Sequence, residues 1–476
     1  MADFVTMSTG GFPLGLDWSK NPESIPDGAL VQAENTEYDH ADGALRTVAG
    51  VTIKLDVGMT IDTLFYDHRH SVFYFSSGTS LYRTDLATYT ALGALEGASR
   101  PVYCRYGEVC LVASGGLLQS IVGGTVLSTL IGSPPVSHYV TSRAGRVIAF
   151  STASDIVNYS AIGDHTSWTN VSSDTSSAQF VNVGYKDPGN IIAIDFLSKV
   201  MVVYKQYGRA YKIISAPEDT TNFAVEPVSE TASCLSMFAT VNIDGYSLYL
   251  GQAGLMAFIP TQDYGDVAPR EVGLNINAWI AKNIDSNCQL WHVQSKKQIW
   301  VKTQNDKRVY LYHYIPRYDD GRGAFTVRSF THDISDVCEV GSDVYVAYGG
   351  KISILNMLVD TDDGVQLQTV IKGANRLAKK HAILIMSKLL ITRNIIAGYG
   401  TLTIGKKSRT VTFSASGQKI YFNTAKLYSS ALRLYSSAYT RYYKVSGGSN
   451  KSVQITLIVP KGAVAIRQLD YDYLEV

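Results

Sequence analysis

The side chains best suited to bind a metal ion stand together in Asp67-His68-Arg69-His70. His68 and His70 are one residue apart, so on a strand both imidazoles would lie on the same face, and imidazole nitrogens are common ligands of zinc. No third ligand stands near them in the sequence, and the segment comes just before a strand-like run. A solvated turn is therefore the favoured interpretation, with a metal site as the alternative.

The other candidate metal-binding and catalytic residues give even weaker evidence of a site. Asn305-Asp306-Lys307 and Asp319-Asp320-Gly321 lack the spaced oxygen ligands of a calcium loop, so both predict hairpin tips. The chain has no GxSxG, HExxH or phosphate-binding glycine loop. Its 5 cysteines are odd in number and scattered, which favours reduced, packed thiols of a protein made in a cytoplasm. We expect no catalytic residue, no cofactor and no metal ion.

The strongest chemical signal is a basic C-terminal region. Gly364–Leu469 contains 17 Lys or Arg residues and no Asp or Glu, so residues 364–476 carry a net charge of +14 and residues 1–363 carry −13. The candidate DNA-channel or inter-subunit charge contacts are two clusters followed by three cations interleaved with tyrosines: Lys372, Arg376, Lys379, Lys380, Lys406, Lys407, Arg409, Arg433, Arg441 and Lys444.

Two functions of this basic region stay open, besides a merely solvated face. Contact with DNA phosphates would release counterions and would be salt-sensitive, but no helix-turn-helix or zinc-finger pattern indicates base readout. Docking against acidic protein surfaces, including this chain's own acidic part or a neighbouring copy, is favoured over DNA contact. No apolar run approaches the roughly 20 residues of a membrane span, so no membrane insertion is expected.

The elements that must position these residues are predicted to be strands. Between residues 61 and 357 one pattern recurs, in which a turn residue, a β run, a second turn and another β run follow each other. Seven copies rich in Val, Ile, Tyr and Phe align, which is typical of half-buried hairpins. They start at Ser71, Gly107, Gly145, Ser198, Gly245, Lys297 and Ser342. A period near 45 residues is typical of propeller blades, and six or seven blades fit equally well. An array of β-sandwiches is the alternative.

The flanking segments differ from this repeat. Residues 1–55 are predicted to be an arm that packs on a later domain, with a tight turn at Ile25-Pro26-Asp27-Gly28 and a hairpin signal at Asp42-Gly43. Residues 56–360 are predicted to form the propeller. Residues 361–476 are predicted to be an antiparallel, sandwich-like β platform, and Ala374–Leu390 is expected to be strand and not helix because β-branched residues surround its apolar positions. The fold class is all-β.

Two resemblances bear on function. Tyr159–Trp168, with Gly163-Asp164, loosely resembles the aspartate box of sialidase-type propellers, in which Asp and Gly shape a turn and the aromatic residue packs between strands. A match of this kind is structural. A sialidase-like hydrolase is the least favoured hypothesis, because the sequence does not locate a pair of catalytic carboxylates.

The order of parts resembles the tail nozzle proteins of short-tailed (podovirus) phages, the group of the packaged-DNA stabilisation and tail tubular B proteins. The resemblance covers most of the chain and is carried by layout and short motifs, namely Asp27-Gly28, Asn35, Asp42-Gly43 with Leu45-Arg46, Gly50, and the stretches 160–168 and 190–213. It implies a virion tail protein without catalysis, assembled in the host cytoplasm as a hexameric ring below the portal-adaptor protein. Such a ring contacts tail spike, fibre or needle proteins, continues the channel for double-stranded DNA without sequence specificity, and retains the genome until ejection.

The alternative function is a propeller-type binding module, such as a tail fibre or receptor-binding subunit, with the basic domain as its attachment point. If the chain is a nozzle protein, the basic residues are less expected to line the DNA channel than to bind protein. A channel that lets DNA slide quickly benefits from weakly interacting walls, whereas many Lys and Arg contacts to phosphate would slow the DNA. Protein docking is therefore the favoured role of the basic region.

Overall fold

A computed structural model describes residues 3–8, 11–41, 43–197, 200–214, 223–243, 245–261, 267–304, 306–314, 323–404, 407–413, 439–443 and 449–475. The side chains of 3–8 and 378–395, and of most strand residues after 406, are outside this description, although their strands are assigned. The regular secondary structure of the described residues is almost entirely β-strand, with α1 (Asn277–Ile280) and two short 3-10 turns, η1 (Gln206–Gly208) and η3 (Gln294–Lys296).

The described part of the propeller region contains seven antiparallel blades of four strands each, of which six are separate sheets and one is part of a larger sheet. The first three blades consist of β7 (Thr63–Asp67), β8 (Val72–Ser77), β9 (Ser80–Thr84) and β10 (Tyr89–Ala94); β11 (Val102–Tyr106), β12 (Val109–Ala113), β13 (Gln119–Val122) and β14 (Val126–Thr129); and β15 (Tyr139–Arg143), β16 (Arg146–Phe150), β17 (Ile156–Tyr159) and β18 (Gln179–Asn182).

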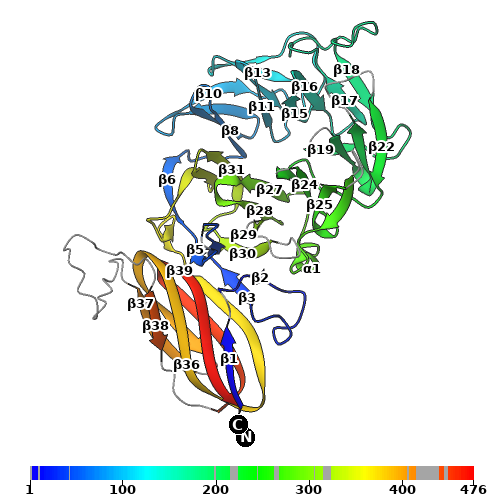
Figure 1. The fold of residues 1–476 in the computed structure, drawn as a ribbon. Coiled ribbons are helices and arrows are strands. Elements are labelled where there is room, and N and C mark those ends of the chain that lie inside the picture. The colour runs from blue at the N-terminus through cyan, green and yellow to red at the C-terminus, as the bar shows by residue number, and fades with distance from the viewer. Residues whose placement is uncertain are drawn as a thin grey trace, which may run out of the picture.

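The next four blades complete the ring (Figure 1). They consist of β19 (Ile191–Leu197), β20 (Val200–Lys205), β21 (Ala210–Ile214) and β22 (Ala224–Ser229); β23 (Thr240–Ile243), β24 (Tyr246–Gly251), β25 (Gly254–Pro260) and β26 (Val267–Glu271); β27 (Gln289–Val293), β28 (Gln298–Lys302), β29 (Arg308–His313) and β30 (Ala324–Ser329); and β31 (Ile334–Val340), β32 (Asp343–Tyr348), β33 (Lys351–Asn356) and β6 (Gly50–Asp56).

Hydrophobic side chains close the ring by filling the space between each blade and the next. The second strands β16, β20 and β28 are buried along their whole length, as expected for strands covered on both faces by neighbouring blades. One cluster joins blades one and two, others join two to three, three to four, six to seven and seven to one, and the largest joins blades four, five and six to the platform. This closed ring of seven sheets is a seven-bladed β-propeller.

The propeller is closed by a strand from the arm. β6 pairs antiparallel with β33, from Gly50↔Asn356 to Asp56↔Lys351. The boundary expected after residue 55 therefore falls inside a strand that belongs to the last blade. Gly50 is required there, because a Cβ atom at this position would lie 2.4 Å from the Val359 carbonyl oxygen, which is backbone and cannot move aside.

The platform is built on two long strands, β36 (Thr369–Ile404) and β39 (Ser449–Glu475). Residues 369–383 of β36 pair with 449–459 of β39, and residues 382–404 pair with 455–475, so each strand is bordered by the other on both edges. The sheet therefore curls round on itself (Figure 1). β37 (Lys407–Phe413) and β38 (Tyr439–Tyr443) both pair with β36. A two-stranded sheet of β34 (Thr361–Asp362) and β35 (Val365–Gln366) precedes this platform.

The arm contributes further strands to the platform. β1 (Asp3–Ser8) pairs with the end of β39, β3 (Ala29–Glu34) pairs with the start of β36, and β5 (Leu45–Thr47) pairs with β39. β2 (Gly15–Leu16) lies beside β3, and β4 (Thr36–Tyr38) forms with β5 the hairpin whose turn contains Gly43. The start of β1 and the end of β39, paired at Asp3↔Glu475, lie at the tip of the platform farthest from the propeller (Figure 1).

The predicted fold class is confirmed. The seven hairpins expected from the repeat are the two middle strands of the seven blades, and the interval Ala374–Leu390 is strand. One feature was not foreseen: blade six and the platform belong to one 13-stranded sheet, because β3 lies between β30 and β36 and contacts both by backbone pairing.

Candidate functional site

The principal cavity of the described structure lies where the innermost strands of all seven blades meet. Its volume is about 330 Å³. The walls carry aromatic side chains from five blades, namely Phe65, Tyr103, Tyr139, Phe238 and Trp291. The lining combines these aromatic groups with charged and amide side chains, and the cavity is large enough for a small molecule.

One wall of this cavity is a hydrogen-bonded network centred on Asp336. Its Oδ1 accepts hydrogen bonds from Trp291 Nε1 at 2.8 Å and Val337 N at 2.9 Å, and lies 3.2 Å from Arg100 Nη2. Its Oδ2 accepts from Leu64 N at 2.7 Å. Because these partners come from blades one, six and seven and from the segment leading into blade two, the network fastens the centre of the ring.

A second carboxylate, Asp195 on the innermost strand of blade four, is held differently. It is 9% exposed; Oδ1 accepts from Phe196 N at 2.7 Å, while Oδ2 is covered and has no hydrogen-bond partner. Burial raises the pKa of Asp195 to about 6, although Ser247, the Phe196 N–H, Asn242 and Arg143 each favour the ionised form. A buried carboxyl with a raised pKa in a cavity is a common mark of a functional site.

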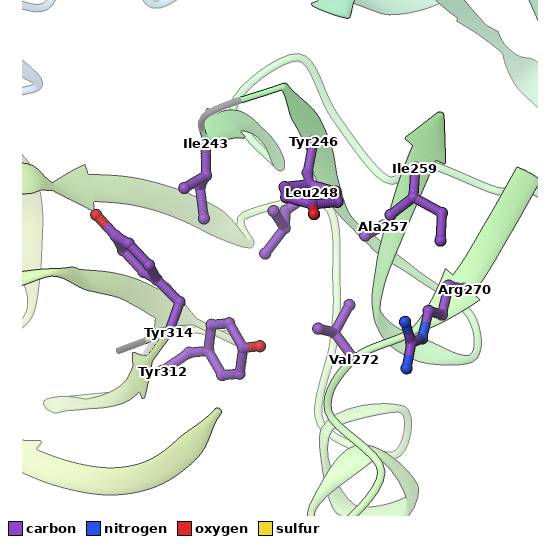
Figure 2. Close-up of a pocket in the computed structure, with 9 residues that line it drawn as sticks. All are labelled: Ile243, Tyr246, Leu248, Ala257, Ile259, Arg270, Val272, Tyr312 and Tyr314. Carbon is purple, nitrogen blue, oxygen red and sulfur yellow. The ribbon is translucent and has the colours of Figure 1, made fainter. Parts of the chain in front are cut away.

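A smaller pocket of about 100 Å³ lies between blades five and six. Figure 2 shows Tyr312 and Tyr314 of blade six on one side and Ile243, Leu248 and Val272 of blade five on the other. The Tyr314 hydroxyl is 2.9 Å from His292 Nε2, and Arg270 completes the lining. The pocket is mainly apolar.

The joint between arm, blade six and platform contains a buried charge network centred on Glu37, which is 1% exposed. Lys296 Nζ lies 2.9 Å from both Glu37 oxygens, and Arg46 bridges Glu37 and Asp39 at 2.9 Å each. Gln298 Nε2 donates to Glu37 Oε2 at 3.1 Å. Burial alone would raise the pKa of Glu37, but Lys296 and Arg46 outweigh it and hold the pKa well below its usual value.

The arm residues that carry the family resemblance are placed in this joint. Asn35 has a positive φ of 53°, donates through Nδ2 to Gln368 O and accepts from Ser329 N, both at 2.8 Å. It therefore ties blade six to the segment that enters the platform. Arg46 belongs to the Glu37 network, and Gly50 begins the closing strand. These three motif residues have structural roles in the joint.

The predicted basic contacts divide into three groups. Arg376 binds the arm of its own chain: Nη2 donates to Ile25 O at 2.6 Å, Nη1 donates to Glu23 O at 3.1 Å, and the guanidinium pairs with Asp27. It thus contacts an acidic partner within the chain and holds the predicted turn at Asp27-Gly28. Lys372 is half-buried on β36. The structure places the remainder on platform strands without side-chain description (Lys379, Lys380, Lys407, Arg409 and Arg441) or outside the described residues (Lys406, Arg433 and Lys444).

The Asp67-His68-Arg69-His70 segment forms a turn between β7 and β8. His70 Nδ1 lies 2.8 Å from Asp67 Oδ2, Tyr74 OH donates to the same oxygen at 3.1 Å, and Arg105 of blade two pairs with Oδ1. The two histidines do not share a ligand, since His68 packs on the ring of Tyr66. Within the described part of the chain, no group of three His, Cys, Asp or Glu side chains is placed to hold a metal ion.

The segment that resembles an aspartate box also has a structural role. Asp164 Oδ1 accepts from Thr166 N at 2.8 Å and from its hydroxyl at 2.6 Å, and Gly163 adopts a positive φ of 76°. Trp168 packs against the cluster between blades two and three. These contacts shape a turn, as the sequence comparison predicted.

Sequence reasoning did not identify the two buried carboxylates of these sites, Asp195 and Glu37. Asp195 is the one charged residue in the apolar run Ile191–Leu197, and a lone acid on an otherwise buried strand was a usable signal. Glu37 had no comparable signal, because its partner Lys296 is 259 residues away.

Comparison with known proteins gives similarities of fold. No family model and no curated protein matches the sequence. Similar solved structures include BamB from Moraxella catarrhalis, with 11% identity, 68% of this chain and 93% of that chain covered, and a TM-score of 0.40. The extracellular domain of a putative one-component system from B. thetaiotaomicron has 10% identity, 84% and 61% coverage and a TM-score of 0.46. The Cps50 (Swd1) β-propeller domain of Myceliophteria thermophila has 10% identity, 65% and 98% coverage and a TM-score of 0.42.

No helix in the described part of the chain has the length and hydrophobicity needed to cross a bilayer.

Proposed function

We propose that this chain is the subunit of a tail nozzle ring in a short-tailed phage, a structural protein without catalytic activity. In this role a hexamer would sit below the portal and adaptor, continue the DNA channel and retain the packaged genome until ejection. The main support for the proposal is the way in which the arm connects the propeller to the platform. The arm residues through which the sequence resembles nozzle proteins, Asn35, Arg46 and Gly50, fasten propeller and platform into one body.

A rigid connection between propeller and platform is expected in a tail subunit that must withstand mechanical force. Two domains in one chain usually move relative to each other unless a large interface joins them. Here β3 pairs with β36 over several residues and with β30 through Glu34↔Val327, and the buried Glu37–Lys296 pair joins the arm to blade six. Force applied to the platform would therefore reach the propeller without a hinge.

The charge distribution supports assembly into a ring. The platform region carries +14 and the rest of the chain −13. In a head-to-tail interface that closes on itself, opposite surfaces of successive subunits meet, and complementary charge favours the correct pairing. Arg376, which binds the acidic arm of its own chain, is an intramolecular instance of this pairing.

The oligomeric state tests the proposal. The purified full-length chain, alone and with adaptor–portal rings, would be weighed by mass photometry and imaged by negative-stain microscopy. A sixfold ring on the adaptor is expected. A chain that stays monomeric in the presence of adaptor rings would contradict the proposal.

Neutralising substitutions distinguish the two roles of the basic region. If it docks protein, Lys406→Gln, Lys407→Gln and Arg409→Gln together impair ring formation, and salt weakens assembly. If it faces DNA, rings form normally while genome retention or ejection changes. Normal assembly together with normal ejection would exclude both roles.

A second candidate is a propeller-type binding module such as a receptor-binding subunit. It is favoured by an apolar surface at blades two and three, where Ile131 is 74%, Val136 52% and Phe180 55% exposed. A groove of about 180 Å³ that includes Phe180 and Trp168 lies beside them. Exposed apolar groups around a groove are common at binding surfaces. A glycan array separates the candidates, since saccharide affinity is expected of the binding module alone.

A further inference from the structure

We propose that the central cavity of the propeller binds a small organic cation, with a primary ammonium group on an apolar or aromatic body. The proposal concerns a site inside the ring of blades and does not depend on the tail function proposed above. It rests on the hydrogen-bonding groups, the charges and the walls of one partly open cavity.

The cavity wall contains acceptors that lack donors. Asp195 Oδ2 and Gln289 Oε1 are both covered by protein and form no hydrogen bond of normal geometry, although Ser247 and Asn242 are near enough to Asp195 to favour its ionised form. Such groups are uncommon in folded proteins, because a buried polar atom without a partner loses the hydrogen bonds that it made with water. An ammonium group in the cavity, with three N–H donors, would donate to Asp195 once the carboxyl turns its covered Oδ2 toward the cavity.

The charges of the cavity favour a cation over an anion. Arg100 is the cationic side chain among the described lining residues, and it is already engaged. Its Nη2 donates to Ser335 O at 3.0 Å and lies 3.2 Å from Asp336 Oδ1, while its guanidinium carbon lies 4.4 Å from the centre of the Phe238 ring. An anion would have to compete with Asp336 for Arg100. A cation would meet Asp195, on which Arg143 acts as the cationic neighbour and whose Oδ2 forms no hydrogen bond.

The walls fit an apolar body that carries this charge. Phe65 and Tyr103 are stacked with ring centres 5.2 Å apart, and Tyr139, Phe238 and Trp291 complete the aromatic lining. Aromatic faces attract cations and also bury apolar carbon. A volume of about 330 Å³ accommodates an amine of about ten heavy atoms and leaves room for water.

Ionisation of Asp195 links this site to pH. The titratable and charged groups around it are Tyr139 and Arg143 of blade three, Tyr204 of its own blade, and Cys234, with the neutral Asn242 and Ser247 beside them. Burial raises the pKa of Asp195 to about 6. Because the cation pairs with the ionised form, binding strengthens as the pH rises through 6 and levels off above 7.

Isothermal titration calorimetry with 2-phenylethylammonium chloride tests the proposal on the full-length protein. We expect one site per chain with a dissociation constant between about 10 µM and 1 mM at pH 7.5. Binding should be about tenfold weaker at pH 5. The neutral isostere 2-phenylethanol and the anion 3-phenylpropionate should bind at least tenfold more weakly than the amine.

Two variants locate the site. Asp195→Asn keeps the size of the side chain and should weaken amine binding about tenfold at pH 7.5 and remove its pH dependence. The matched control Asp343→Asn, at an exposed position at the start of β32, should bind like the wild type. Equal binding of 2-phenylethanol and the amine by the wild type, or no amine binding at 10 mM, would overturn the proposal even if Asp195→Asn does not fold.

Discussion

Removing the charge of Glu37 should weaken the whole subunit. In Glu37→Gln the carboxylate that accepts from Lys296, Arg46 and Gln298 is replaced by a neutral amide, so Lys296 is left buried without a counter-ion. Breaking a buried ion pair by removing one partner typically costs about 3–5 kcal/mol. With an unfolding entropy of about 2.1 cal/mol/K per residue, a chain of this length loses roughly one degree in Tm per kcal/mol, so Tm should fall by about 3–5 °C.

The assay is differential scanning calorimetry at pH 7 on four variants: Glu37→Gln, Lys296→Met, the two combined, and a matched control. The matched control is Glu226→Gln, which removes the half-exposed carboxylate 3.0 Å from Lys212 and should shift Tm by no more than about 1 °C, because surface ion pairs contribute about 0–1 kcal/mol. The double variant Glu37→Gln with Lys296→Met should lose less than the sum of the single losses, since both members of the pair are gone.

The pH dependence supplies a second measurement on the same variants. The pKa of Glu37 is lower in the folded chain than its ordinary value of 4.5. The folded state therefore gains from this carboxylate at pH values above the unfolded pKa, and the gain is lost as the pH falls through the folded pKa. The advantage of the wild type over Glu37→Gln should be constant above about pH 6 and shrink below pH 4.5. A Tm loss equal to that of Glu226→Gln, with no such pH dependence, would refute the role given to the network.

Three further predictions concern other parts of the chain. Gly50→Ala should lower stability by at least about 2 kcal/mol in urea titrations, because its methyl group would meet the Val359 carbonyl; a loss under 0.5 kcal/mol would argue against this close approach. Arg376→Gln should speed proteolysis of the arm near Glu23 several-fold, whereas Lys372→Gln should not, and equal rates for both would show that Arg376 does not hold the turn. Burial raises the pKa of Cys104 to about 11 and of Cys338 to about 12, so thiol-labelling reagents at pH 8 should modify the folded chain about 100-fold more slowly than the urea-unfolded chain, and one fast-reacting thiol would contradict this.

The blades could be predicted because each hairpin is a local signal. A strand, a short turn and a second strand are contiguous in the sequence, and runs such as Val200–Lys205 are apolar enough to be recognised. The outermost strands carry no such pattern, since β10 (Tyr89–Ala94) is largely exposed, and the partner of the last hairpin is found about 300 residues earlier. The number of blades therefore could not be decided between six and seven from the hairpins alone.

The candidate sites were less accessible to sequence reasoning. Charge patterns identified the basic region, but not that Arg376 binds its own arm, because that contact joins residues 349 positions apart. The central cavity depends on seven strands that meet only when the ring closes. Whether a histidine pair binds a metal or a neighbouring carboxylate likewise depends on the surroundings of Asp67, which include Arg105 from the next blade.

The pairing of β6 with β33 has a consequence for the order in which the parts fold during synthesis. All strands of the propeller lie between Gly50 and Asn356, so the ring can close while the platform strands are still being made. The arm strands β1, β3 and β5 must wait for β36 and β39, which are synthesised more than 300 residues later. Until then the strand edges that β36 and β39 will occupy are unpaired, and such edges are sites of aggregation. Slow release of the nascent chain, or a chaperone that covers the arm, should therefore improve the yield of folded subunits.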